Sequence, residues 1–255
     1  MPRETGAAPR HGIARVISKL GVCSRTQAQA LVRAGRVRLN SRIVTDPETP
    51  AIAGRDRIRI DEADIGAAPR VYLALNKPRG LVTTASDERG RRTVYELLQS
   101  LPEGAAPLPW VAPVGRLDQA SEGLLLFSND SAWAAHLTAP ASHVDKIYHV
   151  QIDTLVDAAL LSALCAGSVV DGEDLRAKSV REIRAGEQNS WLEIVLDEGR
   201  NRQIRRLLDS FGIAVLRLIR VAVGAVELGT LAKGQWRFLT DDEITALKSP
   251  VRSKT

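Results

Sequence analysis

An aspartate in a run of polar and small residues is the strongest candidate for chemistry in this sequence. Asp118 precedes Gln, Ala, Ser and Glu, and then comes Gly123 with an apolar run that reaches Phe127. A turn that leads into a buried strand holds a carboxylate rigidly, as a catalytic group requires. Aspartate also caps turns without any chemical role, which is the simpler interpretation. Glu122 could pair with Asp118 as an acid/base couple, but its place beside Gly123 predicts a solvent-facing side chain.

An arginine-rich segment at residues 198–209 is the second candidate. Asn201 is expected to cap a helix there, with apolar positions that form a buried stripe. Arg205 lies at the edge of this stripe. It could pair with Asp209, one turn later on the same helix. The alternative is that it holds a carboxylate from another strand in the ionised form.

Tyr148 is the third candidate. It shares a predicted strand face with Val150 and Ile152, so packing in the core is its ordinary role. Its alternative role is a ring that stacks on a nucleobase, with the hydroxyl left free to form a hydrogen bond.

The composition is that of an ordinary globular protein. The chain has 255 residues, of which 44% are hydrophobic and 25% are charged, enough for one large domain or for one medium and one small domain. Cys23 and Cys165 are far apart and have no Cys or His at ligand spacing, so we expect neither a disulfide framework nor a metal site. No glycine-rich nucleotide motif occurs, and we expect no cofactor. No apolar run is long enough to span a membrane or to form a secretory signal.

From residue 71 onward, strand-like runs alternate with helical patterns. The expected strands are Val71–Leu75, Leu124–Ser128, Tyr148–Ile152, Trp191–Leu196, Leu218–Val223 and Trp236–Leu239. The expected helices cover residues 93–100, 131–138, 154–166 and 201–211. Because the strands outnumber the helices and follow no regular βαβ order, the pattern favours an α+β domain at residues 71–245 with a mixed, mainly antiparallel sheet.

A small helix–helix–hairpin domain is predicted for residues 11–60. Its first helix ends at Gly21, and Ser24 with Gln27 forms a capping-box pattern at the start of the second. Gly35 suits a left-handed cap at the end of this helix. Residues 61–70 lose all periodicity and are predicted to be a linker between the two domains.

Charge is concentrated in the first part of the chain. The chain carries +5 overall, but residues 1–42 contain nine Lys and Arg and only one acid. Such a surface could simply aid solubility, and the excess of Arg over Lys could reflect codon usage. A basic surface on a small fold also suits the phosphates of structured RNA or DNA, and DNA is disfavoured because no recognition helix is evident. The expected contacts are Lys19, Arg25, Arg33, Arg36, Arg38 and Arg42.

Five motifs, in this order, resemble those of the RsuA/RluB branch of the pseudouridine synthases. They are Lys77-Pro78-Arg79-Gly80, Gly115-Arg116-Leu117-Asp118 with the apolar run after it, Lys146-Ile147-Tyr148, the string from Glu198 to Arg206, and Leu218-Ile219-Arg220. Residues 15–40 resemble the S-four or alpha-L RNA-binding module, although Ser41 stands where that module usually has glycine. The resemblance extends from about residue 13 to residue 244.

This resemblance implies a pseudouridine synthase fold and a ribosomal RNA pseudouridine synthase activity. It implies that Asp118 is the essential carboxylate, that Tyr148 stacks on the base and that Arg205 is the ionic partner of Asp118. The late motif and residues 84–98 are more similar to the RluB subgroup, which acts on large-subunit ribosomal RNA. We expect further RNA contacts from Arg116, Arg202 and Arg206.

The implied reaction has no net redox change and uses neither metal nor cofactor. Because hydrolytic glycosidases generally use two carboxyls and a water, a single essential aspartate fits an isomerisation better. We expect a cytoplasmic monomer that binds ribosomal RNA, with no DNA and no membrane as partner. The alternative is a catalytically silent RNA-binding factor of ribosome assembly on the same fold.

Overall fold

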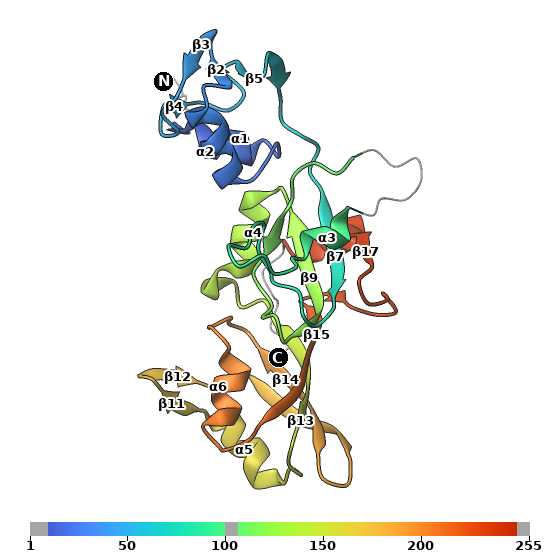
Figure 1. Cartoon of the computed structure of the whole chain (residues 1–255). Coiled ribbons are helices and arrows are strands. Elements are labelled where there is room, and N and C mark those ends of the chain that lie inside the picture. The colour runs from blue at the N-terminus through green and yellow to red at the C-terminus, as the bar shows by residue number, and fades with distance from the viewer. Residues whose placement is uncertain (1–9, 100–106, 249–255) are drawn as a thin grey trace, which may run out of the picture. The chain divides into compact units, whose positions relative to one another are not determined.

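The computed structural model describes residues 10–99 and 107–248 and divides the chain into two compact units (Figure 1). The first unit consists of Met1–Val71, Pro102–Ala112 and Ser128–Ser131. The second consists of Tyr72–Leu101, Pro113–Phe127 and Ala132–Thr255. In the described part of the chain, no helix is both long and apolar enough to cross a lipid bilayer.

The first unit consists of two short helices and small antiparallel sheets. Its elements are β1 (His11–Gly12), α1 (Ile13–Lys19), α2 (Arg25–Arg33), β2 (Val37–Leu39), β3 (Arg42–Val44), β4 (Pro50–Ala51), β5 (Ile58–Ile60) and β6 (Ala63–Ile65). The predicted capping box is confirmed, because the Ser24 hydroxyl accepts from Gln27 N and the Gln27 side chain accepts from Ser24 N. Ile13, Ile17 and Val32 are fully buried in the core that joins the helices to the sheet.

Residues 61–70, predicted as a linker, contain a strand. Among them, Ala63–Ile65 form β6, the edge strand of a four-stranded sheet with the order β3-β2-β5-β6. A tight turn at Asp61 and Glu62, both with positive φ, reverses the chain so that β6 pairs with β5. Three residues are too few for a periodic pattern, and the sequence therefore gave no strand signal here.

The second unit contains a nine-stranded mixed sheet and a separate two-stranded sheet at residues 168–175. Its strands are β7 (Tyr72–Lys77), β8 (Ala112–Val114), β9 (Glu122–Ser128), β10 (Lys146–Ile152), β11 (Ser168–Val170), β12 (Glu173–Leu175), β13 (Ser179–Ala185), β14 (Ser190–Leu196), β15 (Val215–Val223), β16 (Val226–Glu227) and β17 (Trp236–Phe238). Its helices are α3 (Tyr95–Leu98), α4 (Ser131–Thr138), the 3₁₀ turn Pro140–Ser142, α5 (Ala158–Ala166), α6 (Gln203–Asp209) and α7 (Asp241–Ala246). All six predicted strands and all four predicted helices are present; the helix at 131–138 has both predicted ends, and the other elements differ at one or both ends. Residue 100, the predicted end of one helix, lies outside the described residues.

The strand order is β13-β14-β10-β15-β9-β7-β17. The β10, β13, β14 and β15 pairings are antiparallel, whereas β9 and β15 run parallel, which confirms the predicted mixed α+β class. Gly123 permits the close approach of β9 and β15: its φ is +101°, and a Cβ there would lie 2.3 Å from the Arg220 carbonyl oxygen. No other residue fits this position without moving the strands.

The helix of the arginine-rich segment starts two residues later than predicted. Arg202, and not Asn201, is its N-cap, with a left-handed φ of 49° and no capping side-chain hydrogen bond. The prediction was wrong because it relied on the ordinary preference of Asn for this position. In the folded chain the preceding loop is instead held by Gln203, whose side-chain oxygen accepts from Arg200 N at 3.2 Å.

Candidate active site

Asp118 lies in the turn that leads from β8 into β9. Ser121 N donates to the Asp118 carbonyl oxygen at 3.0 Å, which closes the turn, and the carboxylate is left 37% exposed. Residues that follow β7 hold the turn from the other side. Gly80 N donates to Gln119 O at 2.7 Å, and the Thr83 hydroxyl donates to Leu117 O at 2.7 Å. The carboxylate is therefore fixed by its backbone while its oxygens stay accessible.

Lys77 fixes the same turn from inside the protein. Its side chain is fully buried, and the ammonium donates to the carbonyl oxygens of Pro78 at 3.1 Å, Asp118 at 3.1 Å and Ser121 at 2.8 Å. Burial lowers the pKa of Lys77 to about 8, against the opposing charges of Asp118 and Glu122. Three carbonyl dipoles thus compensate this cation, and in return they shape the turn that carries Asp118.

The ion pair with Asp118 comes from Arg202, whose Nη1 lies 3.3 Å from Oδ2 of the aspartate. The structure shows no ion pair of Arg205 with Asp118 or with Asp209, and the role of Arg205 as the ionic partner of Asp118 stays a prediction. Its guanidinium lies between strands and donates to Val215 O at 3.3 Å and to Ala120 O at 3.4 Å. Burial and the nearby Arg202 lower the pKa of Arg205, while Asp118 opposes this shift. Arg205 thus contacts the turn that carries Asp118 at the backbone oxygen of Ala120.

Tyr148 is buried on β10, on the same strand face as Val150 and Ile152, as the alternation predicted. Its side chain lines the pocket that contains Asp118, and this pocket has a volume of about 290 Å³. The volume is near the lower end of the range for small-ligand sites. Apolar walls come from Leu126, Leu137 and Val223, all of which are buried.

Among the lining residues of this pocket, Asp118 is the only carboxylate and the cations predominate. The basic lining residues are Arg116, Lys146, Arg200, Arg202 and Arg220. Such a site suits an electron-rich ligand. Within residues 10–99 and 107–248, no cluster of three or more His, Cys, Asp or Glu side chains could hold a metal ion.

Comparisons with known proteins identify the family of this chain. Residues 71–210 match the family model of RNA pseudouridylate synthase, and residues 12–51 match the S4 domain. The chain belongs to the RNA pseudouridylate synthase family. The N-terminal unit contains the S4 domain that the sequence resembled.

Several relatives and one solved structure cover about nine tenths of the chain or more. An uncharacterized RNA pseudouridine synthase of Rickettsia bellii is 36% identical over 89% of this chain and 96% of its own length. The ribosomal large subunit pseudouridine synthase B of Bacillus subtilis is 32% identical over 92% of this chain and 94% of its own. A crystal structure of a pseudouridylate synthase superposes with a TM-score of 0.62 at 28% identity and covers 93% of this chain and 99% of that one.

In this family member, Glu122 differs from its expected place. Its side chain is only 4% exposed and pairs with Arg217 at 2.6 Å and with Lys233 at 2.6 Å. The prediction of a solvent-facing side chain was wrong because β9 begins at Glu122 and pairs there with Ile219 of β15. Glu122 does not line the Asp118 pocket, so the pairing as an acid/base couple finds no support in the geometry.

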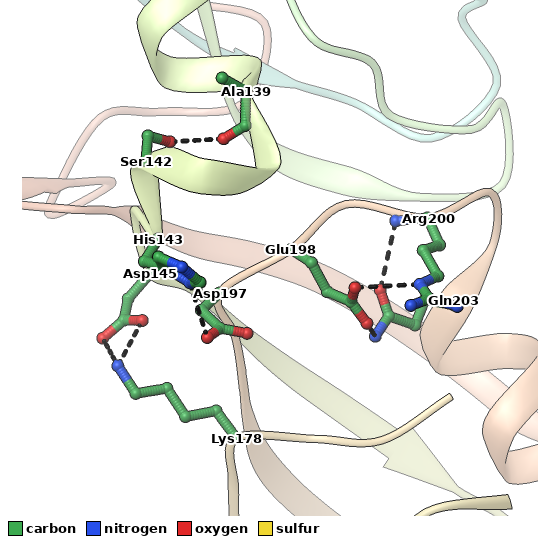
Figure 2. A network of polar contacts seen from close by, with 9 residues as sticks. All are labelled: Ala139, Ser142, His143, Asp145, Lys178, Asp197, Glu198, Arg200 and Gln203. Atoms are coloured by element: carbon green, nitrogen blue, oxygen red, sulfur yellow. Dashed lines mark hydrogen bonds and ion pairs between the residues drawn. The ribbon is translucent and has the colours of Figure 1, made fainter. Parts of the chain in front are cut away.

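A polar network holds the strand ends beside the pocket (Figure 2). Glu198 accepts from Arg200 Nε at 2.9 Å and from Gln203 Nε2 at 2.7 Å. Lys178 bonds both oxygens of Asp145, at 2.7 and 2.8 Å, at the start of β10. The Glu198 contacts fix the loop before α6, which forms part of the pocket rim, to the first residue of this helix.

The remaining predicted RNA contacts of the catalytic unit have different surroundings. Arg116 is exposed at the pocket mouth and forms no ion pair within the described residues. Arg206 is only 20% exposed and is bound to Glu173 and to Asp171, at 3.2 Å for the latter. Arg206 thus anchors α6 to the β11–β12 hairpin.

In the first unit, half of the predicted RNA contacts are paired. Arg25 lies 3.4 Å from Glu48, Arg38 lies 2.7 Å from Glu62, and Arg36 is bound to Asp61. Lys19 Nζ lies 3.2 Å from His11 Nε2. Among the predicted contacts of this unit, the exposed arginines that form no ion pair with a described residue are Arg33 and Arg42. Acids from residues 46–64 reach these cations because β5 pairs with β2.

The sequence assigned no role to Lys77, Lys146 or Arg220, although all three belong to the motifs that carried the resemblance. For Arg220 the sequence pattern could have indicated a role, because Arg220 shares the buried face of β15 with Leu218 and Ala222. A charged residue on an apolar strand face is unfavourable unless a specific partner compensates it.

Proposed function

We propose that this protein isomerises a specific uridine of ribosomal RNA to pseudouridine, with Asp118 as its one essential carboxylate. The observation that carries this proposal is the pocket in which Asp118, alone among the lining residues in being acidic, lies with Tyr148. Hydrolytic glycosidases generally need two carboxyls. A single carboxylate beside an aromatic ring suits a reaction in which the base leaves C1′ and returns to it.

The isomerisation exchanges one bond for another. The N1–C1′ bond breaks, the uracil turns, and C5 bonds to C1′; C5 then loses its proton and N1 gains one. Asp118 compensates the electron deficiency at C1′ while the base is detached. The target uridine has to leave its stack, at a cost of about a few kcal/mol. Stacking on Tyr148 and contacts with the rim cation Arg116 offset this cost.

Large-subunit ribosomal RNA is the proposed substrate. Support comes from the name of the Bacillus subtilis relative, which is a ribosomal large subunit pseudouridine synthase. The S4 domain supports docking on RNA beside the target nucleotide. We further propose that the protein is a cytoplasmic monomer that binds neither DNA nor a membrane.

The test is the Asp118→Asn variant on fragments of large- and small-subunit ribosomal RNA. Pseudouridine is mapped by reverse transcription of carbodiimide-treated RNA. We expect the variant to lose roughly 10³-fold or more of the activity. Asp209→Asn removes an exposed carboxylate of α6 outside the pocket and is expected to stay fully active.

Each result decides between the alternatives. Unchanged modification by Asp118→Asn removes this carboxylate from the mechanism. A wild-type protein that binds these fragments but converts no uridine is the catalytically silent assembly factor. Conversion of small-subunit fragments alone overturns the proposed substrate.

A further inference from the structure

Besides the exposed Arg116, the Asp118 pocket is lined by two less exposed cations that form no ion pair among the described residues. Lys146 is half-buried at the start of β10, and Arg220 is buried on β15 with an exposed fraction of 6%. Arg220 Nε donates to Leu124 O at 2.7 Å, which accounts for one of its five N–H groups. Within the described residues neither side chain takes part in an ion pair, although both line the pocket.

The acids around Lys146 are already engaged. Asp145 is bound by Lys178, Asp197 lies 3.3 Å from His143 Nδ1, and Glu198 is bound by Arg200 and Gln203 (Figure 2). The charges of Lys146 and Arg220 are therefore available to a molecule that enters the pocket.

The strand register brings these cations to Tyr148. Lys146 and Tyr148 are two residues apart on β10, and Tyr148 is the cross-strand partner of Arg220. Burial and the charge of Arg220 lower the pKa of Lys146. Two like charges beside buried aliphatic walls are unfavourable without a ligand. A binding partner with electron-rich oxygens would relieve this cost.

The shape of the pocket selects among such ligands. Leu126, Leu137 and Val223 form its apolar walls, and these suit the faces of a flat ring better than a hydrated phosphate. The two carbonyl oxygens of uracil lie on the edge of such a ring, where cations can reach them while Tyr148 contacts its face.

We propose that Lys146 and Arg220 hydrogen-bond the carbonyl oxygens of the target uracil and stabilise the negative charge on the detached ring. This inference rests on the proposed function. When the N1–C1′ bond breaks, its electron pair stays with the ring and spreads from N1 onto both carbonyl oxygens, while C1′ is left electron-deficient beside Asp118. When C5 bonds to C1′, its electron pair fills the deficiency at C1′ and the ring becomes neutral; C5 then loses its proton and N1 gains one. Donors placed where charge develops act on the rate rather than on binding.

The experiment measures single-turnover rates with an RNA stem-loop that contains the target uridine, at saturating enzyme. Lys146→Met is expected to lower the rate constant roughly 100-fold and to change the Kd for this RNA less than about threefold. Lys146→Arg, which keeps the charge, is expected to recover most of the rate. Arg184→Met removes a cation of β13 outside the pocket and serves as the matched control with an unchanged rate.

A second substrate separates charge stabilisation from simple positioning. In 5-fluorouridine the fluorine withdraws electrons and stabilises the detached ring by itself. The rate of N1–C1′ cleavage in this substrate is expected to fall less with Lys146→Met than the rate with uridine does. An equal fall with both substrates overturns the proposed stabilisation of charge.

The remaining outcomes are also decisive. A weaker Kd with an unchanged rate at saturation makes Lys146 a phosphate contact and overturns the inference. An unchanged rate and Kd overturn it as well. If the wild type converts no uridine, the proposed function fails first, so the two failures are distinguishable. Thermal melting of each variant shows that it is folded.

Discussion

The arginines of the N-terminal unit and the cations of the catalytic pocket differ in what compensates their charge. In the first unit Arg36 is bound to Asp61, Arg38 to Glu62, and Arg57 to Asp64 at 2.6 Å, all at the surface. In the pocket, Lys146 and Arg220 have no carboxylate partner. The unit with the more basic sequence thus has many neutralised cations, and the unit with nearly balanced charge exposes free ones to its pocket.

This difference separates two uses of positive charge. A surface ion pair contributes little to stability because water screens both partners. A cation inside a pocket keeps its field because the surroundings are less polar. The position of a cation in the fold, and not the local excess of basic residues, therefore decides whether it can act on a ligand.

Lys77→Met tests the extreme of this comparison, a fully buried cation that forms no ion pair among the described residues and donates its hydrogen bonds to carbonyl oxygens. The substitution leaves the carbonyls of Pro78, Asp118 and Ser121 without their donor. We expect the free energy of unfolding to fall by about 2–4 kcal/mol, measured by urea denaturation. Lys248→Met, at an exposed position, is the control. A loss no greater than that of the control contradicts a structural role for the buried ammonium.

Glu122→Gln tests a buried carboxylate that is compensated by cations from two other segments. The Arg217 guanidinium, with Lys233, holds the pKa of Glu122 below its ordinary range. A depressed carboxyl pKa adds stability at neutral pH, and this contribution disappears as the pH falls below about 4. We expect the variant to be about 1–2 kcal/mol less stable at pH 7 and to approach the wild type at low pH.

Urea midpoints of both proteins between pH 3 and pH 7 measure this effect. A constant difference across this range contradicts the sign derived from the depressed pKa. In that case the ion pairs of Glu122 with Arg217 and Lys233 do not stabilise the ionised carboxylate, and its hydrogen bonds alone account for its burial.

Local features of the fold were predictable from the sequence because neighbouring residues determine them. The Ser24–Gln27 capping box and the buried face of Tyr148 follow from spacings of two or three residues. The turn that presents Asp118 was likewise evident from polar residues before an apolar run. The domain limits expected at residues 60, 70 and 245 stay predictions, because only the start of β6 within residues 61–70 bears on them.

The partners of charged groups were not predictable in the same way. Glu122 is buried because the parallel β9–β15 contact brings Arg217 to it, across 95 positions of sequence. Arg202 pairs with Asp118 across 84 positions of sequence. Asp61 neutralises Arg36 only after β5 has paired with β2. Each of these depends on a contact between distant segments, which no local pattern encodes.

The smallest expected effect concerns the two kinds of arginine within the N-terminal unit. Arg33 is exposed and has no ion pair among the described residues, whereas Arg36 is bound to Asp61. If the unit docks on RNA phosphates as proposed, Arg33→Ala is expected to weaken binding of the full-length protein. The slope of log Kd against log salt concentration is expected to fall by about 1.

Arg36→Ala is the matched variant, and we expect it to leave both the affinity and this slope unchanged, because a phosphate would first have to displace Asp61. Filter-binding titrations of ribosomal RNA fragments at several salt concentrations measure both quantities. An equal loss for the two variants means that the Arg36–Asp61 pair opens on binding. In that case arginines in surface ion pairs of the first unit also bind RNA phosphates. The pairing of a cation with a carboxylate then no longer distinguishes the arginines of this unit from the cations of the pocket.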